Sequence, residues 1–170
     1  MSTVFNRTRV SEPALFTPCD TTEKVKDFPA VCVSTFSENI IQKFAALRET
    51  EKIAELYTAN GSTPVYKIRY GGQEIAFYQS RVGAPACVSG FEEIIAMGAE
   101  RFVLFGSCGV LDDEKVKKRI IVPVSAVRDE GTSYHYAAPS EEIETDPEQV
   151  RVLKNVLERC GYPYVEVKTW

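Results

Sequence analysis

Apolar positions along this chain switch repeatedly between short continuous runs and helical spacing, which predicts strands that alternate with helices. The apolar run over 30–34 predicts a short buried strand, and the spacing of apolar residues over 40–47 predicts an amphipathic helix after it. A second helical stretch is expected over 51–57. Two β-rich segments within 65–79 then flank the two-residue glycine turn Gly71-Gly72, which predicts a β-hairpin.

A helix and a strand follow the hairpin. Pro85 suits the first turn of a helix and Gly98 suits the position just past its end, so a helix is expected over 85–97. The next segment, over 102–105, is apolar at every position. We therefore expect it to be a strand that is buried on both faces of its sheet.

The last third of the chain predicts two further strands around one helix. The apolar run over 120–124 predicts a strand that ends or bulges at Pro123. Thr145-x-x-Glu148 has the pattern of a capping box, and Gly161 suits the end of the helix that it opens. The side chains expected on the inner face of this helix are Val150, Leu153, Val156, Leu157 and Cys160. A last strand is expected to begin over 164–167.

This alternation predicts an α/β fold, a layered domain with a central mixed, largely parallel β-sheet flanked by helices. The first 28 residues mix prolines, threonines and charges without a clear period. We expect an irregular arm over 1–28, packed on the domain or on a neighbouring subunit, and one domain over 29–170.

Composition and charge exclude several classes of protein. The 20 basic and 24 acidic residues give a net charge of −4, without the basic excess of a nucleic-acid binder. No stretch approaches the roughly 18 apolar residues of a membrane span, and the start has no apolar signal region, so we expect a soluble cytoplasmic protein. The five scattered cysteines and the single histidine, His135, suggest neither a disulfide framework nor a metal site.

Two glycine-bearing loops follow predicted strands, where ligands collect in such sheets. The first, over 80–86, contains Arg81 and Gly83 and leads into a helix N-terminus, whose free N–H groups and dipole favour an anion. The second is Gly106-Ser107-Cys108-Gly109, where small residues let backbone amides approach a ligand and Ser107 adds a hydroxyl. Together they indicate an oxyanion or sugar site, although ordinary tight turns would explain the same glycines.

A third loop, over 128–136, directly follows a predicted buried strand and is rich in side chains that hydrogen-bond or stack, including His135. Loops of this kind often line pockets. A solvated connection, with His135 bonded to a backbone carbonyl, would explain the same sequence.

Taken together, the three loops resemble the nucleoside phosphorylase-I family, which contains uridine phosphorylase, hexameric purine nucleoside phosphorylase and the thioadenosine nucleosidases. The order and spacing of the motifs carry the resemblance, over most of residues 30–170. The motifs are Gly83-Ala84-Pro85, then Met97-Gly98-Ala99, then Gly106-Ser107-Cys108-Gly109, then the segment from Val127 to Tyr136.

The resemblance implies a role in nucleoside metabolism and salvage, with cleavage of the N-glycosidic bond of a ribonucleoside by inorganic phosphate and without a cofactor. It implies small-molecule partners, the nucleoside and phosphate, and a homo-oligomer, either a dimer or a hexamer. Ser107 is expected to contact phosphate, with Arg81 and Gly83 as further candidates. The expected nucleoside-binding residues are Gly106, Cys108, Gly109 and His135.

Two alternatives stay open within the same resemblance. Leu104 occupies the position of a phosphate-binding arginine of family phosphorylases, which favours a nucleosidase that uses water. Family members also continue past Trp170, and their later segments carry the acid that assists the leaving base and the glutamates that hold the ribose. We therefore expect a C-terminally incomplete chain that lacks catalytic residues of its own, and an inactive binding or assembly fragment is the second alternative.

Overall fold

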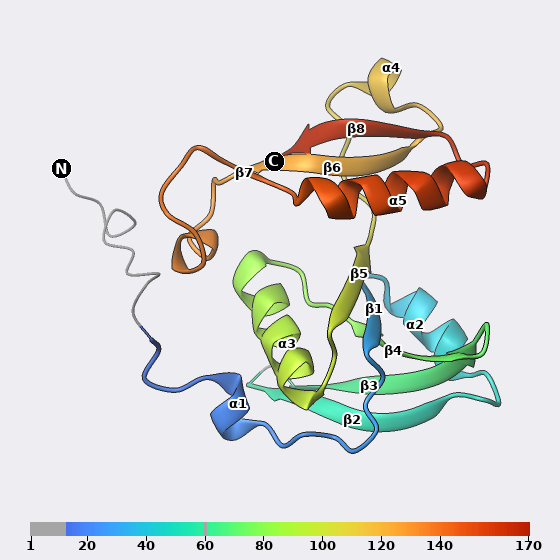
Figure 1. Ribbon diagram of the computed structural model, residues 1–170, viewed down its shortest axis with the longest axis vertical. Helices are drawn as coiled ribbons and strands as arrows, with labels where there is room; N and C mark the ends of the chain where they lie inside the picture. Colours follow the sequence, from blue (N-terminus) through green and yellow to red (C-terminus); the bar gives the residue numbers. More distant parts are fainter. Residues whose placement is uncertain (1–12, 60) are drawn as a thin grey trace. The chain divides into compact units, whose positions relative to one another are not determined.

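The computed structural model describes residues 13–59 and 61–170 (Figure 1). Its contacts divide the chain into two compact units. The N-terminal unit comprises Ala14–Ser107, and the C-terminal unit consists, among the described residues, of Pro13 and Cys108–Trp170. The predicted arm over 1–28 and domain over 29–170 stay predictions, and residues 1–12 of the arm lie outside the described residues. No described helix is long and apolar enough to cross a membrane.

A five-stranded mixed sheet forms the middle of the N-terminal unit, with the strand order β2-β3-β4-β1-β5. Strand β1 is parallel to both β4 and β5, whereas β2, β3 and β4 are joined as antiparallel neighbours. The strands are β1 (Val31–Thr35), β2 (Glu51–Thr58), β3 (Gly61–Tyr70), β4 (Gln73–Gln79) and β5 (Arg101–Phe105). The helices of this unit are α1 (Pro18–Thr21), α2 (Glu38–Ala45) and α3 (Ala84–Met97).

Helices α2 and α3 cover opposite faces of this sheet. Tyr78 of β4 joins the main core together with Ile94 of α3. Its neighbour Phe77 instead meets Phe44 of α2 edge to face, with 6.1 Å between the ring centroids. Because successive side chains of a strand point to opposite faces, the two helices lie on either side of the sheet, as Figure 1 shows.

The C-terminal unit contains a three-stranded sheet with the order β7-β6-β8. Strand β6 (Ile120–Val127) is parallel to β8 (Tyr164–Thr169) and antiparallel to β7 (Glu142–Glu144). Helix α5 (Pro147–Arg159) packs on β6 through a small core of Val122, Val150 and Leu157. The short helix α4 (Asp113–Val116) and the 3₁₀ turn η2 (Ser133–His135) complete the unit.

The predicted α/β class, with a central mixed sheet flanked by helices, is confirmed. The hairpin around Gly71-Gly72 is present as β3 and β4, and both glycines have positive φ, 57° and 81°. Glycine adopts such angles without steric cost, which explains why the turn is visible in the sequence. The bulge at Pro123 is also present, as a register shift between Pro123 and Ser125.

The helix expected over 51–57 is wrong, because this segment forms strand β2. Its glutamates, lysine, alanine and leucine favour a helix locally. Antiparallel pairing with β3, from Glu51 opposite Lys67 to Thr58 opposite Gly61, outweighs that local preference.

The expectation that the strand over 102–105 is buried on both faces is also wrong. Strand β5 lies at the edge of the five-stranded sheet, and Val103, Leu104 and Phe105 are 51%, 42% and 45% exposed. A run of apolar residues predicts a strand but contains no information on which neighbours it will have.

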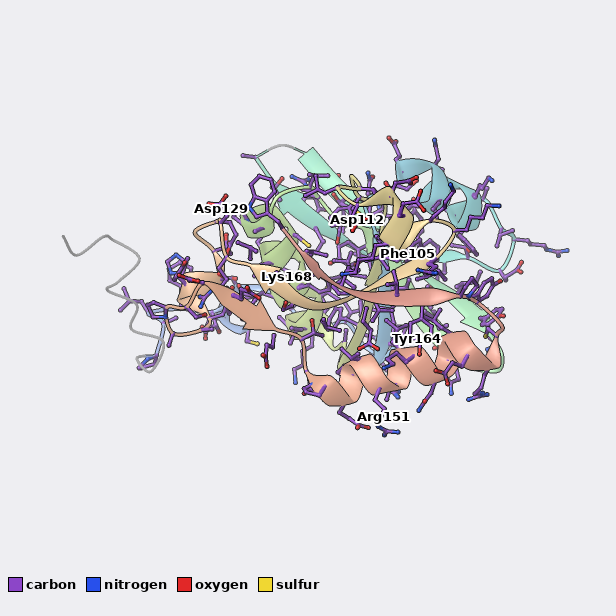
Figure 2. All side chains as sticks on the ribbon, turned by 90° about the horizontal axis from the view of Figure 1, so that it is seen from above. Phe105, Asp112, Asp129, Arg151, Tyr164 and Lys168 are labelled. Carbon is purple, nitrogen blue, oxygen red and sulfur yellow. The ribbon has the colours of Figure 1, made fainter. Side chains whose placement is uncertain are left out.

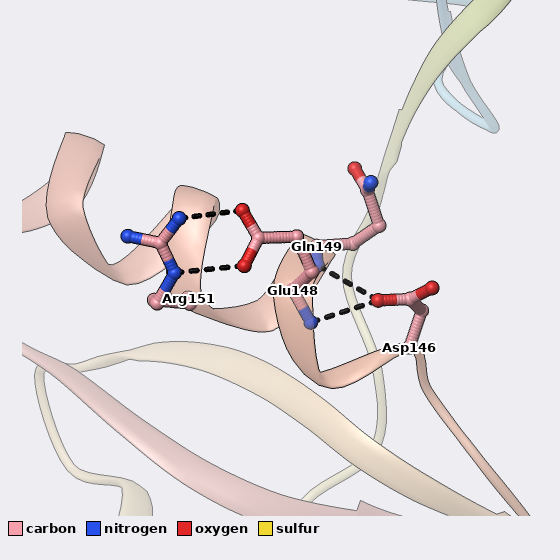
Figure 3. A network of polar contacts seen from close by, with 4 residues as sticks. All are labelled: Asp146, Glu148, Gln149 and Arg151. Atoms are coloured by element: carbon pink, nitrogen blue, oxygen red, sulfur yellow. Dashed lines mark hydrogen bonds and ion pairs between the residues drawn. The ribbon is translucent and has the colours of Figure 1, made fainter.

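The start of α5 differs from the predicted capping box (Figure 3). Asp146 is the N-cap, and its Oδ1 accepts hydrogen bonds from the N–H groups of Glu148 at 2.8 Å and Gln149 at 3.2 Å. Thr145 instead donates its hydroxyl to the carbonyl oxygen of Pro123. On the predicted inner face, Val150 and Leu157 are buried, whereas Leu153, Val156 and Cys160 are exposed.

Candidate functional site

The seven residues predicted to bind ligands are divided between the two units. The N-terminal unit contains Arg81, Gly83, Gly106 and Ser107, and the C-terminal unit contains Cys108, Gly109 and His135.

Gly106 and Ser107 directly follow β5, and Ser107 is exposed. Because β1 and β5 are parallel and in register, Phe36 lies beside Gly106 just past the end of β1. A Cβ atom on Gly106 would come within 2.8 Å of the Phe36 ring. Glycine is therefore required here for packing, whatever else the turn does.

Gly83 forms the N-cap of α3, where its carbonyl oxygen accepts a hydrogen bond from the N–H of Cys87 at 2.9 Å. The neighbouring Arg81 points to the turn between β2 and β3. Its guanidinium donates to the carbonyl oxygen of Gly61 at 2.7 Å and to the hydroxyls of Thr58 and Thr63. Arg81 thus already has acceptors within the unit, which favours a role in holding this turn.

Buried polar groups gather at the carboxyl ends of β1 and β4, and sequence reasoning missed them. Tyr78 is 1% exposed and Ser34 is fully buried, yet neither hydroxyl has a hydrogen-bond partner among the described residues. Burial raises the pKa of Tyr78 to about 12. The nearby Ser80 N–H donates to the carbonyl oxygen of Thr35 at 2.9 Å, which joins the two strand ends.

Cys108 and Gly109 line a hollow of about 470 Å³ in the C-terminal unit. This volume lies within the range typical of small-molecule sites. Two charged residues that line this hollow are labelled in Figure 2: Asp112, which precedes α4, and Lys168, the second-last residue of β8. The other lining residues are Val110, Leu111, Lys115, Val116, Ile121, Val167, Thr169 and Trp170. An apolar wall with one indole ring and a few polar groups suits a flat, partly polar ligand.

Trp170 lies just past the carboxyl end of β8 and is 81% exposed. Its indole Nε1 donates a hydrogen bond of 3.0 Å to Oδ2 of Asp129, which lies past the carboxyl end of the parallel strand β6. The indole orientation is therefore tied to the loop after β6.

That loop also carries His135, which is exposed in the η2 turn. Glu130 fixes the start of the turn, because its carboxylate accepts the N–H groups of Thr132 at 2.6 Å and Ser133 at 3.0 Å. Partial burial acts to raise the pKa of Glu130, but the hydrogen bonds from Ser133 and Thr132 outweigh it and hold that pKa below its usual value.

Arg128, at the start of the same loop, is 6% exposed. Its Nε donates to Ser133 Oγ at 2.9 Å and its Nη2 to the Ala137 carbonyl at 3.0 Å. Its Nη1 donates to the Ala138 carbonyl at 2.5 Å and to Ser140 Oγ at 2.8 Å. Arg128 belongs to the third predicted loop and to the family motif, but the sequence does not show that it is buried.

Comparison with known proteins gives a family match over most of the chain. A family model described as the phosphorylase superfamily matches residues 30–170. The guanosine phosphorylase of Halorubrum lacusprofundi is 28% identical over 83 residues, 49% of this chain and 34% of that protein. The uridine phosphorylase of Treponema pallidum is 30% identical over 104 residues, 59% of this chain and 36% of that protein.

Solved structures match the fold over a larger share. The purine nucleoside phosphorylase of Toxoplasma gondii has a TM-score of 0.69 and 18% identity, covering 84% of this chain and 57% of that one. The uridine phosphorylase of Vibrio fischeri has a TM-score of 0.69 and 22% identity, covering 86% of this chain and 58% of that one. The matched segment spans about a third of the curated relatives and under 60% of these structures.

Proposed function

Because this chain belongs to the phosphorylase superfamily, whose model matches residues 30–170, we propose that it takes part in phosphorolysis of a ribonucleoside, as uridine phosphorylases do. The resemblance seen in the loops is thereby confirmed at the level of the family. The proposed reaction breaks the N-glycosidic bond and yields the free base and ribose 1-phosphate. The hollow beside Cys108 and Gly109 is the observation that supports it most directly.

The proposed chemistry needs two ligand sites and no resident cofactor. Inorganic phosphate attacks C1′ of the ribose as the base departs, so positive charge develops on the sugar and negative charge on the base. We assign the hollow lined by Cys108, Gly109 and Trp170 to the base. Ser107, exposed in the preceding turn, is assigned to phosphate, which its hydroxyl can reach as a donor.

The roles of Arg81 and Gly83 at phosphate, and of Gly106 and His135 at the nucleoside, stay proposals of the same kind. The bonds of Arg81 to the β2–β3 turn make Ser107 the stronger phosphate candidate of the two.

For the whole protein we also propose a cytoplasmic homo-oligomer, a dimer or a hexamer. Light scattering on the purified chain tests the oligomer.

Product analysis of the purified chain tests the proposed reaction. Uridine and inosine are incubated with and without inorganic phosphate, and free base, ribose and ribose 1-phosphate are separated by chromatography. We expect base and ribose 1-phosphate only when phosphate is present. Ser107→Ala should slow the reaction about tenfold or more, because a hydrogen bond to a charged group is lost. Ser89→Ala, on the exposed side of α3, is the matched control.

Hydrolysis is the second candidate, and Leu104 favours it. This apolar residue is 42% exposed on β5, two positions before Gly106, where family phosphorylases carry a phosphate-binding arginine. Base release with free ribose, at a rate unchanged by phosphate, would contradict phosphorolysis and support a nucleosidase. Absence of base release from either nucleoside in both buffers would contradict activity in this chain and leave a binding or assembly role.

A further inference from the structure

The buried guanidinium of Arg128 is unusual because its hydrogen-bond acceptors among the described residues are all neutral. Among residues 13–59 and 61–170, no carboxylate forms an ion pair with it, and its partners are carbonyl oxygens and hydroxyls. A buried charge is costly unless its hydrogen bonds are satisfied. Here four N–H···O bonds engage all three guanidinium nitrogens, so the cation is stable only while the surrounding loop keeps this conformation.

The ring of Tyr134 closes the remaining side of this cation. The Arg128 Cζ atom lies 4.2 Å from the ring centroid, in the range of a cation–π contact. The Tyr134 hydroxyl in turn donates to the backbone carbonyl of Arg128 at 3.3 Å. Arg128 is therefore bonded to the loop within the η2 turn and after it.

The position of this arginine in the fold connects it with the candidate base site. Val127 is the last residue of β6, so Arg128 and Asp129 stand at the carboxyl end of a strand parallel to β8. Arg128 holds the segment that contains the exposed His135, and Asp129 holds the indole of Trp170. Two consecutive residues thus fix two surfaces that a nucleoside could contact.

We infer that Arg128 is a positioning residue for nucleoside binding. It holds the loop over 132–140 in one conformation before the ligand arrives, so that His135 and Tyr136 are presented without an ordering cost on binding. The identity of the ligand rests on the proposed function, whereas the ordering of the loop by Arg128 is independent of it. Lysine cannot replace this arginine, because a single ammonium lacks the planar fork that reaches acceptors on both sides of the turn.

Two measurements on Arg128→Lys separate the ordering of the loop from ligand binding. The first is amide hydrogen exchange of the ligand-free chain, where we expect exchange over 132–140 to accelerate about tenfold or more while α5 is unchanged. The second is calorimetric titration with uridine and with inosine, where we expect the dissociation constant to rise about tenfold. As a control, thermal unfolding of the unsubstituted chain and of Arg128→Lys checks that each is folded at the temperature of the titration.

Arg151→Lys is the matched control, because Arg151 is an exposed arginine of the same unit that pairs with Glu148 at 2.5 Å (Figure 3). It should change neither measurement. Ser140→Ala removes one acceptor of the guanidinium and keeps the cation, so it should accelerate exchange over 138–140 by a smaller factor. If Arg128→Lys lacks a cooperative unfolding transition and so does not fold, Ser140→Ala tests the ordering of the loop in its place.

The outcomes distinguish this inference from the proposed function. Unchanged exchange over 132–140 in Arg128→Lys overturns the inference, whatever the nucleoside affinity is. If Arg128→Lys does not fold, unchanged exchange in Ser140→Ala overturns it instead. Faster exchange with unchanged nucleoside affinity overturns the positioning role in binding. If the unsubstituted chain binds neither uridine nor inosine, the proposed function and the ligand part of the inference both fail, and the exchange data still judge the ordering of the loop.

Discussion

At the scale of single residues, packing and ligand binding make different demands on the glycines of the 106–109 turn. Gly106 has no room for a Cβ atom because of Phe36, whereas a Cβ on Gly109 would meet nothing within 4 Å. A motif that resembles a binding loop thus contains one glycine required by its neighbour and one with open space. This open space lies at the hollow that Gly109 lines, which is the proposed base site.

Gly106→Ala should destabilise the chain by about 1–2 kcal/mol, because an added methyl group must displace the Phe36 ring. Urea unfolding measures the change. Gly109→Ala is the control and should be nearly neutral. The double variant Gly106→Ala with Phe36→Leu should recover part of the loss, and equal losses for both glycines would contradict the packing argument.

Cysteine alkylation at pH 8 should separate the thiols by exposure and by pKa. Burial raises the pKa of Cys32 to about 12, so this fully buried thiol stays protonated and unreactive at pH 8. The exposed Cys108 and Cys160 should react with iodoacetamide. Mass spectrometry of peptides measures each site.

Added uridine should slow the alkylation of Cys108 several-fold, because this thiol lines the proposed base site. Cys160, at the C-terminal end of α5, is the internal control and should react at an unchanged rate. Equal protection of both thiols, or of neither, would place uridine elsewhere.

At the scale of elements, the ends of helices and the partners of strands decide structure that local patterns leave open. Helix α5 begins one residue later than the sequence pattern indicates, because Asp146 occupies the cap while Thr145 bonds across to β6. Strand β2 forms despite helix-favouring residues, because β3 supplies its hydrogen bonds. In both cases the deciding contact comes from another segment.

Asp146→Ala should reduce stability by about 1 kcal/mol, since it leaves two N–H groups of the first turn of α5 without their acceptor. Thr145→Ala loses one exposed hydrogen bond and should cost less. Chemical unfolding of both variants measures the difference. A larger loss of stability for Thr145→Ala than for Asp146→Ala would indicate that Thr145 is the cap.

At the scale of the whole molecule, each compact unit has a core of its own. The N-terminal core includes Cys32, Val65 and Tyr78, and the C-terminal core is the smaller group around Val122. A unit with a continuous core and its own sheet is expected to fold as a domain does.

A protein restricted to 14–107 should therefore unfold in one cooperative thermal transition, followed by circular dichroism. A gradual, featureless loss of signal would show that the N-terminal unit depends on the rest of the chain. A protein restricted to 108–170, which has fewer buried apolar residues, is the comparison and should melt at a lower temperature.

The sequence predicted those parts of the fold that depend on neighbouring residues. Gly71-Gly72 and Gly98 mark chain reversals and helix ends through their own backbone freedom, so the β3–β4 hairpin and α3 were predictable. The family motifs likewise identified the turn whose Cys108 and Gly109 line the hollow. Arg128 was not predictable, since its burial depends on carbonyl groups nine and ten residues away.

The exposed position of β5 also affects how the protein behaves in solution. Among the described residues this strand pairs only with β1, and it presents Val103, Leu104 and Phe105 at an open sheet edge. Such an edge can add a strand from another molecule, and no lysine or proline interrupts these five residues to prevent it. In a concentrated sample, Val103→Lys should slow self-association through this edge, because a lysine on an edge strand opposes pairing with a strand of another molecule.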